Sequence, residues 1–146
     1  MAANTNPIYS RTGDLQGIQT SNLTASTTDG TGANVSLFFT ADATEGGWVD
    51  RVVCKPIGST AATVIRIFYC TATGAYTAGT TNTTSTTFLL AEATVAAVTS
   101  STTAAQNDVV IPIRMILPAS TKLLVGFGTA TGASTGYSVL AVGGKY

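Results

Sequence analysis

Seven carboxylates and two cysteines are the side chains of this chain that could take part in acid–base, nucleophilic or metal chemistry. The carboxylates are scattered, and no two have the spacing of a general acid and a general base. There is no histidine, which removes the usual base of a catalytic triad and the commonest metal ligand. Asp42 and Glu45 share a loop that lacks the dense oxygen ligands of a calcium site. We therefore expect a protein that is not an enzyme and that holds no metal and no cofactor.

The two cysteines bear on how the strands that carry them are arranged. Residues 46–57 and 63–70 are rich in β-branched and aromatic residues, and residues 58–62 between them are small and polar. If the strands pair as a hairpin, the sulfurs of Cys54 and Cys70 lie about 13 Å apart along the ladder, too far for a disulfide. Only strands in different sheets could bring them together. We predict the hairpin, with two reduced, partly buried thiols.

The strand at 63–70 has two unlike faces. Ile65 and Ile67 lie on a side that is purely apolar or aromatic, so this side should face a core. Arg66 lies beside Phe68 on the other side, which is expected to be half exposed to water or covered by another chain.

Further stretches of alternating or β-branched residues predict more strands. They are 15–25, 33–40, 86–98, 109–117, 122–128 and 137–142. A helix competes at 86–98, but the threonines and valines there favour a strand. Pro112 withholds a ladder donor and so indicates a sheet edge or a bulge. A bulge near Asp50 would let Val49 and Val52 both point inward.

About eight short strands, with turns every ten to fifteen residues and no convincing helix, define the fold class. We predict an all-β, two-sheet β-sandwich of the jelly-roll kind with antiparallel strands, a closed barrel being the alternative. The sandwich is expected to span residues 14–146 as a single domain. The Thr-rich stretch 71–85 is expected to be a loop too polar to pack.

Charge and hydropathy narrow the class of partner. Charged residues make up only 10% of the chain, and seven basic residues balance seven acidic ones. Without a cluster of Lys and Arg, neither a nucleic acid nor an anionic membrane is an expected partner. No apolar run approaches the ~18 residues of a membrane span, and the opening residues lack the features of a secretory signal, so synthesis in a cytoplasm is expected. A low-charge, half-apolar sandwich of this kind fits a protein that is packed against copies of something.

Residues 1–13 precede the sandwich and are expected to form an arm. Pro7, Ile8 and Tyr9 make a short apolar island in an otherwise polar segment. One interpretation is a frayed terminus tucked against the domain, and the other is an arm that docks on a neighbouring subunit. Ten extended residues can reach ~33 Å.

Five short motifs, spread over nearly the whole chain, carry a resemblance. They are Asn-Pro-Ile-Tyr at 6–9, Val-Asp-Arg-Val-Val at 49–53, Val-Ile-Arg-Ile-Phe at 64–68, Ile-Leu-Pro-Ala at 116–119 and Val-Leu-Ala-Val-Gly-Gly-Lys-Tyr at 139–146. Together they resemble small structural proteins of tailed bacteriophages, the head decoration or cement proteins. Such relatives commonly end in Gly-Gly-Asp-Tyr, where this chain has Lys145.

The resemblance implies a jelly-roll protein on the exterior of the icosahedral head, made in the host cytoplasm. It would bind the expanded capsid and bridge neighbouring subunits of the major capsid protein, with its own copies associated as a dimer in preference to a trimer. In that setting Pro7, Ile8 and Tyr9 would form the docking arm and Tyr146 a terminal anchor. The competing hypothesis is a tail or fibre-associated module that binds a host glycan, which an exposed loop aromatic such as Tyr76 would favour.

Overall fold

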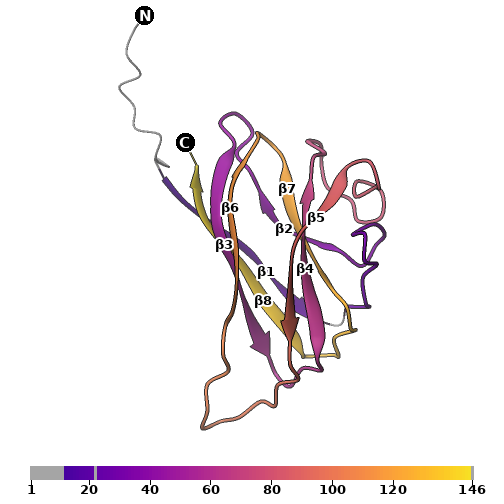
Figure 1. The fold of residues 1–146 in the computed structure, drawn as a ribbon, viewed down its shortest axis with the longest axis vertical. Coiled ribbons are helices and arrows are strands. Elements are labelled where there is room, and N and C mark those ends of the chain that lie inside the picture. Colours follow the sequence, from indigo (N-terminus) through magenta and orange to yellow (C-terminus); the bar gives the residue numbers. More distant parts are fainter. Residues whose placement is uncertain (1–11, 22, 146) are drawn as a thin grey trace, which may run out of the picture.

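The computed structural model describes residues 12–21 and 23–145 of the chain. These residues form eight strands and no helix, arranged as two four-stranded antiparallel sheets (Figure 1). The strands are β1 (Thr12–Ser21), β2 (Ser36–Thr40), β3 (Gly47–Ile57), β4 (Thr63–Cys70), β5 (Thr87–Val95), β6 (Val109–Leu117), β7 (Lys122–Phe127) and β8 (Gly136–Lys145). The prediction of a two-sheet, all-β sandwich is confirmed.

The strand order is that of a jelly roll. Sheet A runs β1-β8-β3-β6 and sheet B runs β2-β7-β4-β5. Early strands pair with late ones, β1 with β8, β2 with β7, β3 with β6 and β4 with β5, and successive pairs lie in opposite sheets. The chain is therefore one long antiparallel ribbon rolled into two layers. The β3–β8 and β4–β7 ladders close the roll.

The main core lies between the two sheets. Its fully buried side chains include Phe39, Ile65 and Ile67 from sheet B and Val49 from sheet A. Tyr137 of β8 stacks on Phe127 of β7 with ring centroids 5.1 Å apart, which joins the two sheets directly. Alternation along each strand sends these residues inward and their neighbours outward.

The expected hairpin of β3 with β4 is wrong. The two strands belong to different sheets, and residues 58–62 cross from one sheet to the other. A short polar link between two apolar strands serves either geometry, so local pattern does not distinguish them. Cys54 and Cys70 are nevertheless both free and buried, and burial raises the pKa of Cys54 to about 12. Cys54 belongs to the main core, whereas Cys70 belongs to a second cluster that includes Phe68.

Three expected strand details are confirmed. The ladders of β3 shift register between Val49 and Arg51, and Val49 and Val52 are both fully buried. Pro112 lies in β6, which is an edge strand of sheet A. The stretch where a helix competed is strand β5.

Candidate interaction surfaces

The described residues contain no cluster of side chains that could hold a metal ion. Within residues 12–21 and 23–145, no three His, Cys, Asp or Glu side chains lie close enough to hold a metal ion. The carboxylate of Asp42 is engaged by its own loop, because Oδ1 accepts hydrogen bonds from the backbone N–H of Thr44 and of Glu45 at 2.9 and 3.1 Å. These two bonds hold the pKa of Asp42 below its ordinary value.

A hydroxyl-lined cavity of about 240 Å³ lies at the end of the sandwich away from Thr12 and Lys145. Its polar lining comes from Ser59, Thr60, Thr63, Thr129, Thr131, Thr135 and Tyr137. No charged side chain lines it. Among the described residues there is no helix of the length and hydropathy that a membrane span requires.

The first candidate surface is the end of the sandwich where both termini leave (Figure 1). The structure does not describe the four predicted contact residues, Pro7, Ile8, Tyr9 and Tyr146. Of the expected arm, Thr12 and Gly13 belong to β1, where they pair with Lys145 and Gly144 of β8. The points from which residues 1–11 and residue 146 continue the chain are therefore direct neighbours in one ladder.

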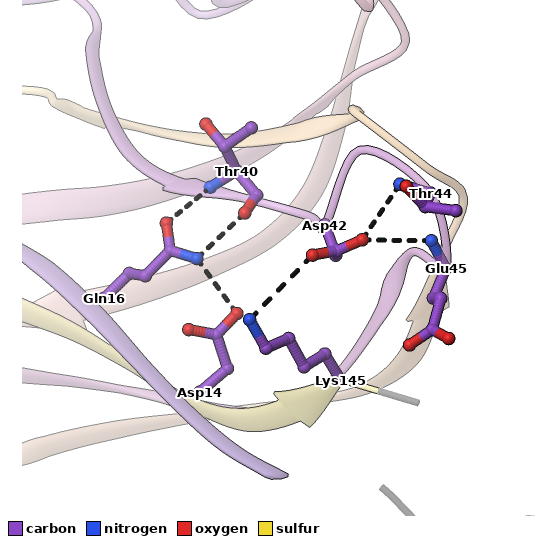
Figure 2. A network of polar contacts seen from close by, with 7 residues as sticks. All are labelled: Asp14, Gln16, Thr40, Asp42, Thr44, Glu45 and Lys145. Atoms are coloured by element: carbon purple, nitrogen blue, oxygen red, sulfur yellow. Dashed lines mark hydrogen bonds and ion pairs between the residues drawn. The ribbon is translucent and has the colours of Figure 1, made fainter. Parts of the chain in front are cut away.

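A polar network holds this end together (Figure 2). The Gln16 amide of β1 bonds both backbone groups of Thr40 in β2, since Nε2 donates to the carbonyl at 2.8 Å and Oε1 accepts from the N–H at 2.9 Å. Gln16 Nε2 also donates to Asp14 Oδ2 at 3.0 Å. Lys145 Nζ lies 3.9 Å from Asp42 Oδ2 and ties β8 to the loop after β2. Gln16 thus links sheet A to sheet B as a backbone ladder would.

The second candidate surface is the outer face of sheet A, which we call the bare face. Strand register aligns its positions in three rows across the four strands: Gly13–Gly144–Trp48–Ile116, Leu15–Val142–Arg51–Pro112 and Gly17–Leu140–Val53–Val110. Four of its apolar side chains are exposed, Leu15 by 65%, Ile116 by 58%, Val110 by 54% and Leu140 by 37%. Aligned exposed apolar side chains of this kind are typical of a surface that a partner covers.

Charges on and beside the bare face are paired within the chain. Arg51 Nη1 lies 2.6 Å from Asp50 Oδ2, and Lys55 Nζ lies 3.1 Å from Asp108 Oδ1. Arg114, on β6, adds one further positive charge. The bare face is therefore close to neutral.

The outer face of sheet B, which we call the covered face, has a small core of its own. Val35, Phe68, Cys70 and Leu124 are buried there, and Leu37, Ala72 and Tyr76 pack against them. The cover comes from the segments 23–35 and 71–86, which lie beside sheet B in Figure 1. The outward side of β4 is thus covered by this chain's own loops at Phe68 and Cys70. Towards the start of the strand, Val64 and Arg66 are only half-buried, as expected, and Arg66 Nε donates to Glu92 Oε1 at 2.8 Å.

The expectation that residues 71–85 are too polar to pack is wrong. Tyr76 is partly buried, its hydroxyl donates to the Val35 carbonyl at 2.7 Å, and burial raises its pKa to about 12. The cover does not reach the edge of sheet B, where Phe88 and Leu89 of β5 stay exposed.

Asn82 fastens the two covering segments to each other. Its Nδ2 donates to the carbonyls of Gly30 and Gly32, both at 2.8 Å, and its Oδ1 accepts from the N–H of Gly79 at 2.7 Å. The side chain is almost fully buried, and three bonds satisfy it. A single buried amide in a Thr-rich string leaves no periodic hydrophobic pattern, which is why sequence reasoning missed it.

Lys122 fastens the cover to sheet B. The residue is 3% exposed, and its ammonium group donates to the carbonyls of Ala72 at 2.6 Å and Ser120 at 3.0 Å. Ala72 lies near the start of the 71–86 segment, so that part of the segment is held against the first residue of β7.

Comparisons with known proteins add no relative. No protein-family model, no curated protein and no solved structure matches this chain. The bacteriophage resemblance therefore stays an expectation from the sequence, to which the structure adds the two surfaces.

Proposed function

We propose that this chain is a structural protein of a bacteriophage virion, which binds the outer surface of the capsid and bridges neighbouring major capsid protein subunits. The observation that carries the proposal is the pairing of Thr12 with Lys145. The two segments expected to contact the capsid, the arm and Tyr146, continue from neighbouring positions at one end of the sandwich. One rigid body with two adjacent attachment segments suits a clamp across a seam between subunits.

The physical role is mechanical. A thin shell that holds packed DNA gains strength from clamps that bury surface across subunit seams, and many copies make modest interfaces decisive. The proposed protein acts as a homo-oligomer, a dimer rather than a trimer, on the exterior of the head. The zero net charge of the chain fits a protein partner better than a nucleic acid or a membrane.

The glycan-binding alternative loses its main support. An exposed loop aromatic such as Tyr76, the kind of side chain that stacks on sugar rings, would have favoured it. Its ring instead packs on the covered face and its hydroxyl is bonded to Val35.

Removal of residues 1–11 tests the proposal. The truncated chain keeps all of β1, so it should stay folded, with an unchanged circular dichroism spectrum, while its binding to expanded, undecorated capsids falls on the order of 100-fold or more. Co-sedimentation with capsids measures the binding, and electron microscopy of the full chain on heads shows location and copy number.

A matched pair of variants isolates the apolar island. Ile8→Ser with Tyr9→Ser should weaken binding strongly, whereas Asn4→Ser with Thr5→Ser in the same arm should not. Truncated protein that decorated heads normally would contradict the role of the arm. Binding on a glycan array without binding to capsids would favour the alternative function.

A further inference from the structure

The outer face of sheet B is covered by other segments of the chain, whereas the outer face of sheet A is not. On sheet B, two long connections fold back over the apolar side chains of β4 and β7. On sheet A, no described segment packs over Leu140, Val110 or Ile116. Leu140 and Val110 share one row across β8, β3 and β6, and Ile116 lies further along β6 in another row. Exposed apolar rows of this extent are rare on a protein that works as a monomer.

The bare face has the size of a stable interface. Four strands about 4.8 Å apart and about eight residues long give a face of about 500 Å² in projection. The accessible area of a ridged surface exceeds its projection, which brings the face near the ~800 Å² per partner that a standard interface buries. Sheets that pack face to face interdigitate alternate side chains in the same way as the rows here.

The charge pattern selects a second copy as the occupant. A two-fold contact brings a face against itself, so a face with a strong net charge repels its own copy. Here Arg51 is paired with Asp50 and Lys55 with Asp108, which leaves Arg114 as a single further positive charge on the face. Such a face repels its own copy only weakly and exerts little field on a strongly charged partner.

Association by a sheet edge is disfavoured on both sides of sheet A. Pro112 and the positive φ of Arg114 (50°) interrupt the edge strand β6. On the other edge, the side chain of Gln16 reaches from β1 to the backbone of Thr40, so β2 of sheet B lies beside this edge and hinders the approach of another strand. The face, rather than an edge, is left for a partner.

We propose that the bare face is the surface through which two copies of this chain associate, sheet A against sheet A about a two-fold axis, to give a four-layer dimer. This inference deepens the proposed function, since it assigns the contact between copies on the head. Its test uses no capsid, so the dimer and the capsid-binding role can fail separately.

Analytical ultracentrifugation of the full chain tests the proposal. The wild-type chain should sediment as a dimer, and Leu140→Glu should raise the dimer dissociation constant on the order of 100-fold or more, because two unpaired carboxylates would be buried together. Val110→Glu should act in the same direction. Its side chain is 54% exposed on an edge strand, so it keeps the test valid if Leu140→Glu fails to fold. Thr94→Glu, at an exposed position on β5 of sheet B, is the matched control and should leave the dimer intact.

Tryptophan emission gives a second readout. Trp48 is the only tryptophan of the chain, and alternation places it on the bare face, because its neighbour Val49 points into the core. Its emission should shift to shorter wavelength as the concentration rises through the dissociation constant, and the shift should vanish in Val110→Glu. A chain that is monomeric at ~100 µM, well above a micromolar dissociation constant, a dimer that survives both glutamates, or a trimer would each overturn the proposal, since a two-fold contact closes at two copies.

Discussion

The covered face and the bare face are two sides of one sandwich built from similar strands. Phe68 and Leu124 on the covered face are fully buried, whereas Leu140 and Val110 on the bare face are 37% and 54% exposed. The difference comes from the connections between strands. Segments 23–35 and 71–86 lie over sheet B, whereas the connection between β5 and β6 extends beyond the end of the sandwich and covers neither face (Figure 1). Alternation therefore shows that a strand has two apolar sides, but the connections decide what covers each side.

Truncation of Phe68 should have the largest effect on stability. Phe68→Ala removes a fully buried ring from beneath the cover and should lower the free energy of unfolding by ~3–5 kcal/mol. Val110→Ala on the bare face should change it by no more than ~0.5 kcal/mol, since its surroundings are open in the monomer.

Chemical denaturation at a protein concentration low enough to keep the chain monomeric measures both changes. Equal costs for the two variants would mean that the covered face contributes no more than an exposed surface. The contrast between the faces would then be wrong.

Two glycines in the cover provide a finer comparison. Gly30 and Gly32 both have positive φ, 75° and 91°, so alanine at either position is strained by ~1–2 kcal/mol. A Cβ at Gly30 would lie 2.5 Å from a Phe68 ring carbon, whereas one at Gly32 would meet nothing within 4 Å. Gly30→Ala should therefore be less stable than Gly32→Ala by a further ~1–3 kcal/mol. Equal melting temperatures for the two variants would contradict this, because they would show that the segment around Gly30 can move away from Phe68 without loss of stability.

The smallest effect leaves overall stability unchanged and appears only in thiol reactivity. Cys70 lies under the cover, which can open locally, whereas Cys54 lies between the sheets and needs the sandwich to open. Burial also raises the pKa of Cys54 to about 12, so little of it is thiolate at pH 8. Labelling followed by mass spectrometry should modify Cys70 at least ~10-fold faster than Cys54, corresponding to a local opening easier by ~1.4 kcal/mol. Faster labelling of Cys54 would place the weak point in the sandwich instead, and in denaturant both thiols should react alike.

Much of the fold could be predicted because it depends on local pattern. Alternation and β-branched residues located all eight strands, the bulge at Asp50 followed from the need to bury both Val49 and Val52, and Pro112 marked an edge. The partner of each strand could not be read in the same way. The link 58–62 is compatible with a hairpin and with a crossing between sheets, and the choice depends on ladders formed with β6, β7 and β8 far along the chain.

The surfaces were predicted least well, for a related reason. The sequence showed that Phe68 and Arg66 share a side of β4, but not that Asn82 and Tyr76 would bring a Thr-rich loop over that side. The bare face went unnoticed because its rows are made of single residues from four strands. Those rows exist only once the register of sheet A is known.

The pairing of the first strand with the last also constrains how the protein is made. Sheet A places β8 between β1 and β3, so these two strands stay unjoined until β8 has left the ribosome. Contacts between such distant parts of a chain make folding slow, on the order of milliseconds to seconds for two-layer β-proteins. Sheet A is then completed only after β8 has emerged, and a chain that still lacks β8 presents no complete bare face to its siblings on a polysome. If copies associate through that face as proposed, strand order alone would delay their association until β8 is in place.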